Sequence, residues 1–248
     1  QSPTSAPSGR RLLLEKKNIM KKILIQILSF ITVKYWSKLK GIHIHDSVII
    51  FGHFSNSSAS NQIDIRHSIL KRTSIEVNGN NNKINLQGPF SATKIKVIGN
   101  NNQINIQKIN GITLSEIIIR GENCNISIER YSRFGSYLKL ICMGKSNSIS
   151  IGEDCMLADH VELWNTDSHP IYNDQGEIIN PSRPIIIGNH VWIGKDSRVT
   201  KGVNIGNNAI IGFNSLVTKN IKSNTLNAGS PTRQIREGVN WDQRFITI

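Results

Sequence analysis

A run of six consecutive six-residue repeats between residues 187 and 222 constrains this chain more than any other feature. The repeats read IGNHVW, IGKDSR, VTKGVN, IGNNAI, IGFNSL and VTKNIK. Position one is always Ile or Val, position two is Gly or Thr, and position five is small or β-branched. Each repeat supplies one short strand and one bend, so three repeats close a triangular coil that stacks on the next coil by parallel hydrogen bonding. The period therefore predicts a parallel β-helix, for which hexapeptide repeats are a known signature.

The repeat also occurs upstream, in the same phase. IGEDCM and LADHVE occupy residues 151–162, and Ile151 precedes Ile187 by 36 residues, which is six whole repeats. Residues 163–186 break the pattern and are expected to form a loop. Because loops on a rigid scaffold carry many functional side chains, this break is the first place to look for a site.

Before residue 151 the chain repeats a longer and looser pattern. Two aliphatic residues at alternate positions precede a glycine, and two more follow five and seven positions after it. The glycines are Gly79, Gly99, Gly121 and Gly144, at intervals of 20, 22 and 23 residues. Such alternation marks strands, and the asparagine runs beside the glycines suit bends with left-handed backbone. We therefore expect one continuous parallel β-helix over 42–222, irregular at first and regular later.

The composition agrees with an all-β chain. The 248 residues include 42 Ile and 28 Asn. Isoleucine favours strands and asparagine tolerates tight turns, whereas a helical bundle would be rich in Leu and Ala. The three cysteines, Cys124, Cys142 and Cys155, match no zinc module by their spacing, so we expect buried thiols.

Most of the positive charge lies near the N-terminus. Residues 1–40 carry nine Lys or Arg and one Glu, which leaves +5 of the net charge of +13 for the rest. We expect a disordered or vector-encoded tail over 1–19 and a basic amphipathic helix over 20–40. This helix either packs on the first coil or another subunit, or rests on anionic lipid at the inner face of the membrane. Its apolar run is too short to span a bilayer and no small-residue cleavage site follows it, so a cytoplasmic protein is expected. No nucleic-acid motif accompanies the charge, so nucleic-acid binding is not expected.

The loop over 163–186 holds one histidine, His169, directly before a proline. Histidine is the natural general base near neutral pH, so His169 is the first catalytic candidate. A solvated loop histidine is the alternative interpretation.

Four motifs in and after this loop resemble those of the hexapeptide-repeat acetyltransferases. They are DSHPIY (167–172), PIIIGNHVWIG (184–194), IIGFNSLVTK (210–219) and AGSPTRQI (228–235). Their order and spacing are similar to the branch of galactoside, maltose and nodulation-factor O-acetyltransferases and of capsule and polysialic acid O-acetyltransferases. The resemblance covers 151–235 and implies that the β-helix is left-handed. Together with the segments expected from the residues, the expected fold is a left-handed parallel β-helix with a short N-terminal helix and a C-terminal tail.

The resemblance implies acetyl transfer from acetyl-CoA to a hydroxyl group, with His169 as the catalytic base. It also implies a homotrimer whose active sites lie between neighbouring chains. Trp192 matches a family position close to the acetyl and acceptor site, with packing at a subunit contact as the alternative. Asp167 is a candidate to hold the imidazole tautomer, a task that a main-chain carbonyl could also perform.

The coenzyme contacts that the resemblance implies lie on the regular coils and just after them. They are Gly212, Ser215, Lys219, Ala228, Gly229, Pro231 and Arg233. Small residues allow the backbone to approach pantetheine, and the two cations suit phosphate groups, with solvated charge as their alternative. The expected organisation is irregular coils over 42–150, catalytic coils over 151–222, and a coenzyme-contacting loop and tail over 223–248, where the polar pattern from residue 232 allows a short helix.

Three rival functions remain open. Some hexapeptide β-helices are zinc enzymes, but His160, His169 and His190 do not have the spacing of that ligand set, so no metal is expected. Amino-sugar N-acetylation is possible on the same fold, although the DSHP loop favours O-acetylation. A non-catalytic polysaccharide-binding scaffold would account for the irregular coils but not for the order of motifs after Asp167.

The family branch implies a bacterial surface glycan as acceptor: capsule, polysialic acid or O-antigen. Six cations follow the irregular coils: Arg66, Lys71, Arg72, Lys83, Lys94 and Lys96. If they lined one groove they would attract an acidic polysaccharide. The alternative is that they are solvated on strand edges, where Lys also blocks edge pairing.

Overall fold

The computed structural model describes residues 41–244 and 246, and all regular structure within them is β-strand. The helix expected over 20–40 and the tail expected over 1–19 lie outside the described residues. Within the described part there is no helix, and hence none long and apolar enough to cross a membrane. The strands form a left-handed parallel β-helix of about eight turns, as the repeats and the family resemblance predicted.

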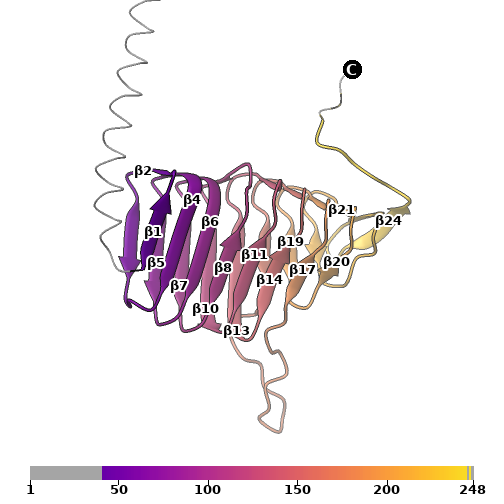
Figure 1. The fold of residues 1–248 in the computed structure, drawn as a ribbon. Coiled ribbons are helices and arrows are strands. Elements are labelled where there is room, and N and C mark those ends of the chain that lie inside the picture. Colours follow the sequence, from indigo (N-terminus) through magenta and orange to yellow (C-terminus); the bar gives the residue numbers. More distant parts are fainter. Residues whose placement is uncertain (1–40, 245, 247–248) are drawn as a thin grey trace, which may run out of the picture.

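Three sheets form the three sides of the solenoid (Figure 1). Sheet A contains β1 (Ile42–His45), β2 (Val48–Ile50), β4 (Gln62–Lys71), β6 (Lys83–Ser91), β8 (Gln103–Ile106), β9 (Ile112–Thr113), β11 (Asn125–Ile128), β14 (Ser148–Ile151), β17 (Ile185–Ile187) and β20 (Asn204–Ile205). Sheet B contains β3 (His53–Asn56), β5 (Ser74–Asn78), β7 (Lys94–Ile98), β10 (Glu116–Glu122), β13 (Lys139–Lys145), β16 (Glu162–Trp164), β19 (Arg198–Thr200) and β22 (Leu216–Val217). Sheet C contains β12 (Arg133–Phe134), β15 (Met156–Leu157), β18 (Trp192–Ile193), β21 (Ile210–Ile211), β23 (Thr225–Ala228) and β24 (Arg233–Glu237).

The core consists of aliphatic columns that run along the solenoid axis. In sheet A, Ile84 pairs with Ile104, which in turn pairs with Ile126, and all three are buried. The first residues of the six-residue repeats continue these columns: Ile187 pairs with Ile205, and Ile193 pairs with Ile211. The first and fifth positions of all six repeats in 187–222 are buried, as are the alternate aliphatic residues beside the glycines of the irregular coils. The three cysteines are buried and unpaired, as expected.

The loop break is an excursion from a single coil. Ile151 of β14 pairs directly with Ile187 of β17, so these two residues occupy neighbouring coils although 36 positions separate them. The next step, from Ile187 to Ile205, takes only 18 residues. The excess length forms a finger that projects from one edge of the solenoid between β16 and β17 (Figure 1).

Buried asparagines hold the bends of the irregular coils together. Asn82 donates from Nδ2 to the Gly99 carbonyl at 2.8 Å, and its Oδ1 accepts the Asn102 backbone N–H at 2.9 Å. Asn102 repeats the arrangement with the Gly121 carbonyl at 2.8 Å and the Cys124 N–H at 2.9 Å. Each buried side chain therefore satisfies backbone groups at the bend of the neighbouring coil.

The chain ends its stacking in an antiparallel turn. After β23, strand β24 reverses and pairs with it, joining Thr225 to Glu237 and Ala228 to Arg233. The short helix allowed from residue 232 was wrong, because this segment forms backbone hydrogen bonds with the last strand of sheet C. The reversal covers that edge of the final coil.

The glycines beside the asparagine column generate the first testable prediction. A Cβ on Gly99 would lie 1.9 Å from the Gly121 carbonyl oxygen, and its φ is 113°. Gly176 also has positive φ, but a Cβ there would meet nothing within 4 Å. We expect Gly99→Ala to lower the free energy of unfolding by about 2–4 kcal/mol, from strain plus overlap. Gly176→Ala should cost only about 1 kcal/mol. Urea denaturation followed by circular dichroism measures both, and equal losses would contradict the explanation.

Candidate active site

His169 lies at the base of the finger, shortly after β16 leaves sheet B. The finger has its own internal order: Tyr172 and Ile178 form an antiparallel bridge, and Asn173 Oδ1 accepts the backbone N–H groups of Gln175 and Glu177. The sequence predicted a loop here, and the structure shows a short hairpin-like excursion. His169 is therefore presented on an ordered segment.

Asn180 ties the two strands of the finger together beside His169. Its Nδ2 donates to the His169 carbonyl and to Asp167 Oδ2, each at 2.9 Å, and its Oδ1 accepts the Ile171 N–H at 2.6 Å. Lys201, from the next coil, bonds to Asp167 Oδ2 and donates to the Asn180 carbonyl at 3.1 Å. These contacts anchor the base of the finger to the solenoid.

The Asp167 carboxylate serves this anchor. The Lys201 ammonium lowers the pKa of Asp167 below its usual range by direct hydrogen bonding. Desolvation by burial opposes this effect, and a hydrogen bond from Asn180 lowers the pKa further. Asp167 therefore stays ionised at neutral pH. Its side chain bonds to Lys201 and Asn180 in this structure, and its suggested role on the His169 imidazole remains a prediction.

A cleft of about 400 Å³ lies between His169 and the outer face of sheet B. Ser168 and His169 line one side, and Trp164 lies at the end of β16. The floor includes Ile118 and Ile141, which pair with each other across β10 and β13 and are almost fully buried. The exposed histidine thus borders a space with an apolar floor and polar walls, which a small polar molecule could enter.

Trp192 lies on another side of the solenoid. It belongs to β18 of sheet C, between Met156 and Ile210, and it is 36% exposed. The cleft beside His169 is lined from sheet B, so a single chain does not bring Trp192 into it. A site that contains both side chains would need two chains.

The C-terminal segment makes contacts beside Trp192 that the repeat pattern does not predict. Trp241 stacks on the His190 ring at 4.3 Å and donates from Nε1 to the His190 carbonyl at 2.8 Å. His190 Nδ1 also lies 2.8 Å from Asp154 Oδ2, and Gln243 donates to Asp154 Oδ1 at 2.7 Å. The one local signal for this anchor is the apolar character of Trp241. Its partner, His190, is 51 residues away, so no local pattern links the two.

Four of the residues expected to contact coenzyme lie together at the last coil. A Cβ on Gly212 would lie 2.8 Å from the Ala228 Cβ, so the two backbones are close. The buried Ser215 hydroxyl accepts the Gly229 N–H at 3.1 Å and so holds the 228–231 segment on the solenoid. Lys219 and Arg233 are exposed, the latter at the start of β24. Pro231, after a cis peptide bond, lies between them in the chain.

No group of three or more His, Cys, Asp or Glu residues in 41–244 is arranged to hold a metal ion. His160 and His190 each lie beside one aspartate, Asp196 at 3.2 Å and Asp154 at 2.8 Å. These are ion-pair geometries.

Residues 184–219 match the family model of the bacterial transferase hexapeptide, six repeats. The match covers six repeats, displaced by three residues from those counted from Ile187, and it takes in β18 with Trp192 and the bend after β21 with Gly212.

Curated relatives with similar sequences are acetyltransferases. A polysialic acid O-acetyltransferase of Neisseria meningitidis is 43% identical over 81 residues, which is 32% of this chain and 37% of that protein. A second one, of Escherichia coli O1:K1 / APEC, is 36% identical over 125 residues, covering 50% and 40%. The matched part spans about two fifths of these relatives.

A solved structure extends the likeness to the whole solenoid. The polySia specific acetyltransferase NeuO superposes with a TM-score of 0.63 at 26% identity, covering 83% of this chain and 91% of that chain. The shared fold therefore includes the irregular coils, where the sequence alone gave no family motif.

The anchor at the base of the finger generates the second prediction. Lys201→Ala should raise the pKa of Asp167 toward the ordinary value of about 3.9, because its main stabilising partner is removed. In the wild type, the stabilisation from this pair is present above the ordinary aspartate pKa and is lost as pH falls through the lowered value. NMR titration of the Asp167 carboxyl carbon measures the shift, and hydrogen exchange should quicken in 166–182.

Lys222→Ala is the matched control, because Lys222 forms an exposed pair with Glu237 at 4.0 Å away from the finger. Both variants should change the free energy of unfolding by less than about 1 kcal/mol, as surface ion pairs do. An unchanged Asp167 pKa in Lys201→Ala would show that the anchor does not form in solution.

Proposed function

We propose that this protein transfers an acetyl group from acetyl-CoA to a hydroxyl of a bacterial surface glycan, with His169 as the general base. One observation carries the proposal: the histidine of the DSHP motif is exposed on an anchored finger and borders an open cleft. The likeness to polysialic acid O-acetyltransferases supports the reaction class. The acceptor class is capsule, polysialic acid or O-antigen.

The chemistry requires a base because an alcohol is a poor nucleophile at neutral pH. The His169 imidazole accepts the hydroxyl proton as the oxygen attacks the thioester carbonyl, and a C–O bond forms. When the tetrahedral intermediate collapses, the C–S bond breaks and the imidazolium returns the proton to the leaving thiolate. A backbone N–H or an indole N–H such as that of Trp192 would stabilise the oxyanion.

Acetyl-CoA would lie along the regular coils and the segment after them. The close approach of Gly212 to Ala228, and the Ser215 bond that fixes Gly229, offer a smooth backbone surface for pantetheine. Lys219 and Arg233 are exposed cations suited to the nucleotide phosphates. These assignments come from the family resemblance and are part of the proposal.

The proposal includes a homotrimer with sites shared between chains. His169 and Trp192 belong to different sides of one solenoid, so His169 of one chain would meet Trp192 of the next. The protein would act in the cytoplasm, where acetyl-CoA is made, and residues 20–40 would supply any contact with the inner face of the membrane.

The third prediction tests the base. His169→Ala should lower turnover with a glycan acceptor by about 10²–10⁴-fold, because the attacking hydroxyl loses its proton acceptor. Acetyl-CoA binding should change little, since the imidazole acts on the acceptor. Thiol release from acetyl-CoA measures turnover and calorimetry measures binding. His43→Ala, an exposed histidine on β1, is the control and should keep wild-type rates. A loss of less than about fivefold in His169→Ala would remove the residue from this role.

The fourth prediction tests the shared site. His169→Ala and Trp192→Ala should each be poorly active alone, but chains of both kinds assembled together should recover activity. Random mixing leaves about a quarter of sites with both side chains intact in a cyclic trimer. Sedimentation of the mixture checks assembly. Mixed trimers that stay as inactive as the separate variants would contradict a site between chains.

A further inference from the structure

A groove runs across the coils on the outer face of sheet B. A second cleft, of about 660 Å³, adjoins the cleft beside His169, and the two share Glu116 and Lys139 on β10 and β13. Together they extend from the finger across successive strands of the sheet. We call this continuous space the sheet B groove.

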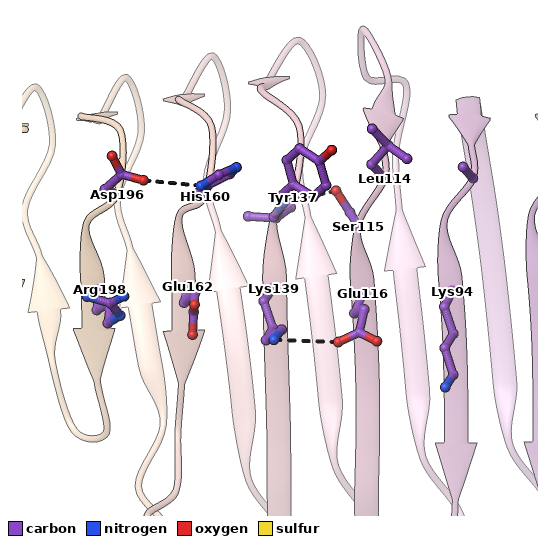
Figure 2. A pocket seen from close by; sticks show the side chains of 12 residues that line it. Lys94, Leu114, Ser115, Glu116, Tyr137, Lys139, His160, Glu162, Asp196 and Arg198 are labelled. Carbon is purple, nitrogen blue, oxygen red and sulfur yellow. Dashed lines mark hydrogen bonds and ion pairs between the residues drawn. The ribbon is translucent and has the colours of Figure 1, made fainter. Parts of the chain in front are cut away.

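Charges of alternating sign form one row of the groove. Lys94, Glu116, Lys139, Glu162 and Arg198 occupy the same register position on β7, β10, β13, β16 and β19. Since neighbouring strands are about 4.8 Å apart, the row places a cation and a carboxylate in turn over about 19 Å. Figure 2 shows these five side chains in line, with Asp196, His160 and Tyr137 in a second row beside them.

The charges of the whole groove nearly balance, because three carboxylates (Glu116, Glu162 and Asp196) face four cations: Lys94, Arg120, Lys139 and Arg198. Lys139 lies 3.7 Å from Glu116, and Glu162 accepts a hydrogen bond from the Trp164 indole at 2.8 Å. In the second row, His160 lies 3.2 Å from Asp196. An acidic polymer in the groove would meet Glu116, Glu162 and Asp196 as well as the cations, and repulsion from these carboxylates would offset the attraction.

Apolar surface lies next to the charges. Tyr137 is 52% exposed and packs edge-on against His160 at 4.7 Å, and Leu114 is 44% exposed on the neighbouring coil. Trp164 closes the end nearest His169. Exposed rings beside alternating donors and acceptors suit sugar rings, which present C–H faces and hydroxyls that both donate and accept.

The cations of the irregular coils do not turn the groove positive. Arg66 and Lys83 belong to β4 and β6 of sheet A, on another side of the solenoid, and Arg66 pairs with Asp64 at 2.7 Å. Lys96 is on sheet B but pairs with Glu76 at 2.9 Å. The single groove of cations considered from the sequence therefore does not form.

We propose that the sheet B groove binds a glycan chain without net charge and directs it to His169. The proposal rests on the proposed function for what happens at His169, but the binding itself does not depend on catalysis. It separates this protein from relatives named for polysialic acid, because the nearly balanced charges of this groove give a polyanion little net attraction.

The test measures glycan binding by the full-length protein without acetyl-CoA. The probes are oligosialic acid, the same chain with its carboxyl groups reduced to alcohols, and neutral hexose and N-acetylhexosamine oligosaccharides. Calorimetry at low and high salt gives the affinities. The tightest probe should be neutral, and its dissociation constant should change less than about twofold with salt. Tightest binding of oligosialic acid that weakens as salt rises, or binding of none of the probes, would overturn the proposal.

Two matched pairs of variants place the binding in the groove. Tyr137→Asn should weaken the neutral probe about tenfold, while Tyr131→Asn should not, because both tyrosines are exposed at left-handed bends but only Tyr137 lines the groove. Asparagine tolerates that backbone, so both variants should fold. Glu116→Gln should improve oligosialic acid binding by about threefold or more, while Asp64→Asn on sheet A should not.

The outcomes separate the two proposals. If His169→Ala keeps its glycan affinity but loses acetyl transfer, both proposals stand. If His169→Ala transfers acetyl groups normally while Tyr137→Asn loses glycan affinity, the groove proposal stands and only the role of His169 fails. If Tyr137→Asn changes sedimentation and leaves glycan affinity intact, the groove is covered by a second copy of the chain and the glycan assignment is wrong.

Discussion

Hydrogen bonds that run along the axis, from the bend of one coil to the bend of the next, are the constraint on which the rest of the structure depends. Parallel strands satisfy their own backbone groups, but the backbone groups at a bend lack strand partners. Asn82 and Asn102 supply the missing partners in the irregular coils, and the glycines beside them let successive bends approach closely. In the last coils Ser215 has the same task toward Gly229. Without these contacts each coil would bury unpaired donors and acceptors, at a cost of about 1–3 kcal/mol for each.

The sequence predicted what is periodic. The six-residue period allows Ile187 and Ile193 only an inward orientation, and the looser repeat places Gly99 at a bend. The structure shows that a side chain at this bend would have no room. What it did not predict depends on residues from different coils or segments. Lys201 reaches Asp167 from 34 positions away, and Trp241 reaches His190 from 51. Neither pair has a spacing that local periodicity could reveal, because an excursion or a chain reversal separates its members.

The candidate site shows the same division. His169 stood out because a histidine in a polar break of a regular repeat suggests function, and the family motif strengthened that inference. The charge pattern of sheet B was hidden, since Lys94, Glu116 and Lys139 are about one coil apart in a region whose repeat length varies. Only the register of the strands shows that their signs alternate. The net charge was a poor guide to the acceptor, because it does not show on which side of the solenoid the cations lie.

The finger leaves and rejoins the solenoid at strands that pair in register, Ile149 with Ile185 and Ile151 with Ile187. Residues added to or removed from its tip therefore shift no other strand, and its composition is free of the six-residue rule that governs the coils on either side. Lengthening the finger costs little, since loop-closure entropy grows only with the logarithm of length. Homologous chains can thus reshape the rim of the cleft, and with it the choice of acceptor, while the geometry around the base of the finger stays fixed. The fold thus separates the tip of the finger, whose length and composition can vary, from the coils, whose repeat must be kept.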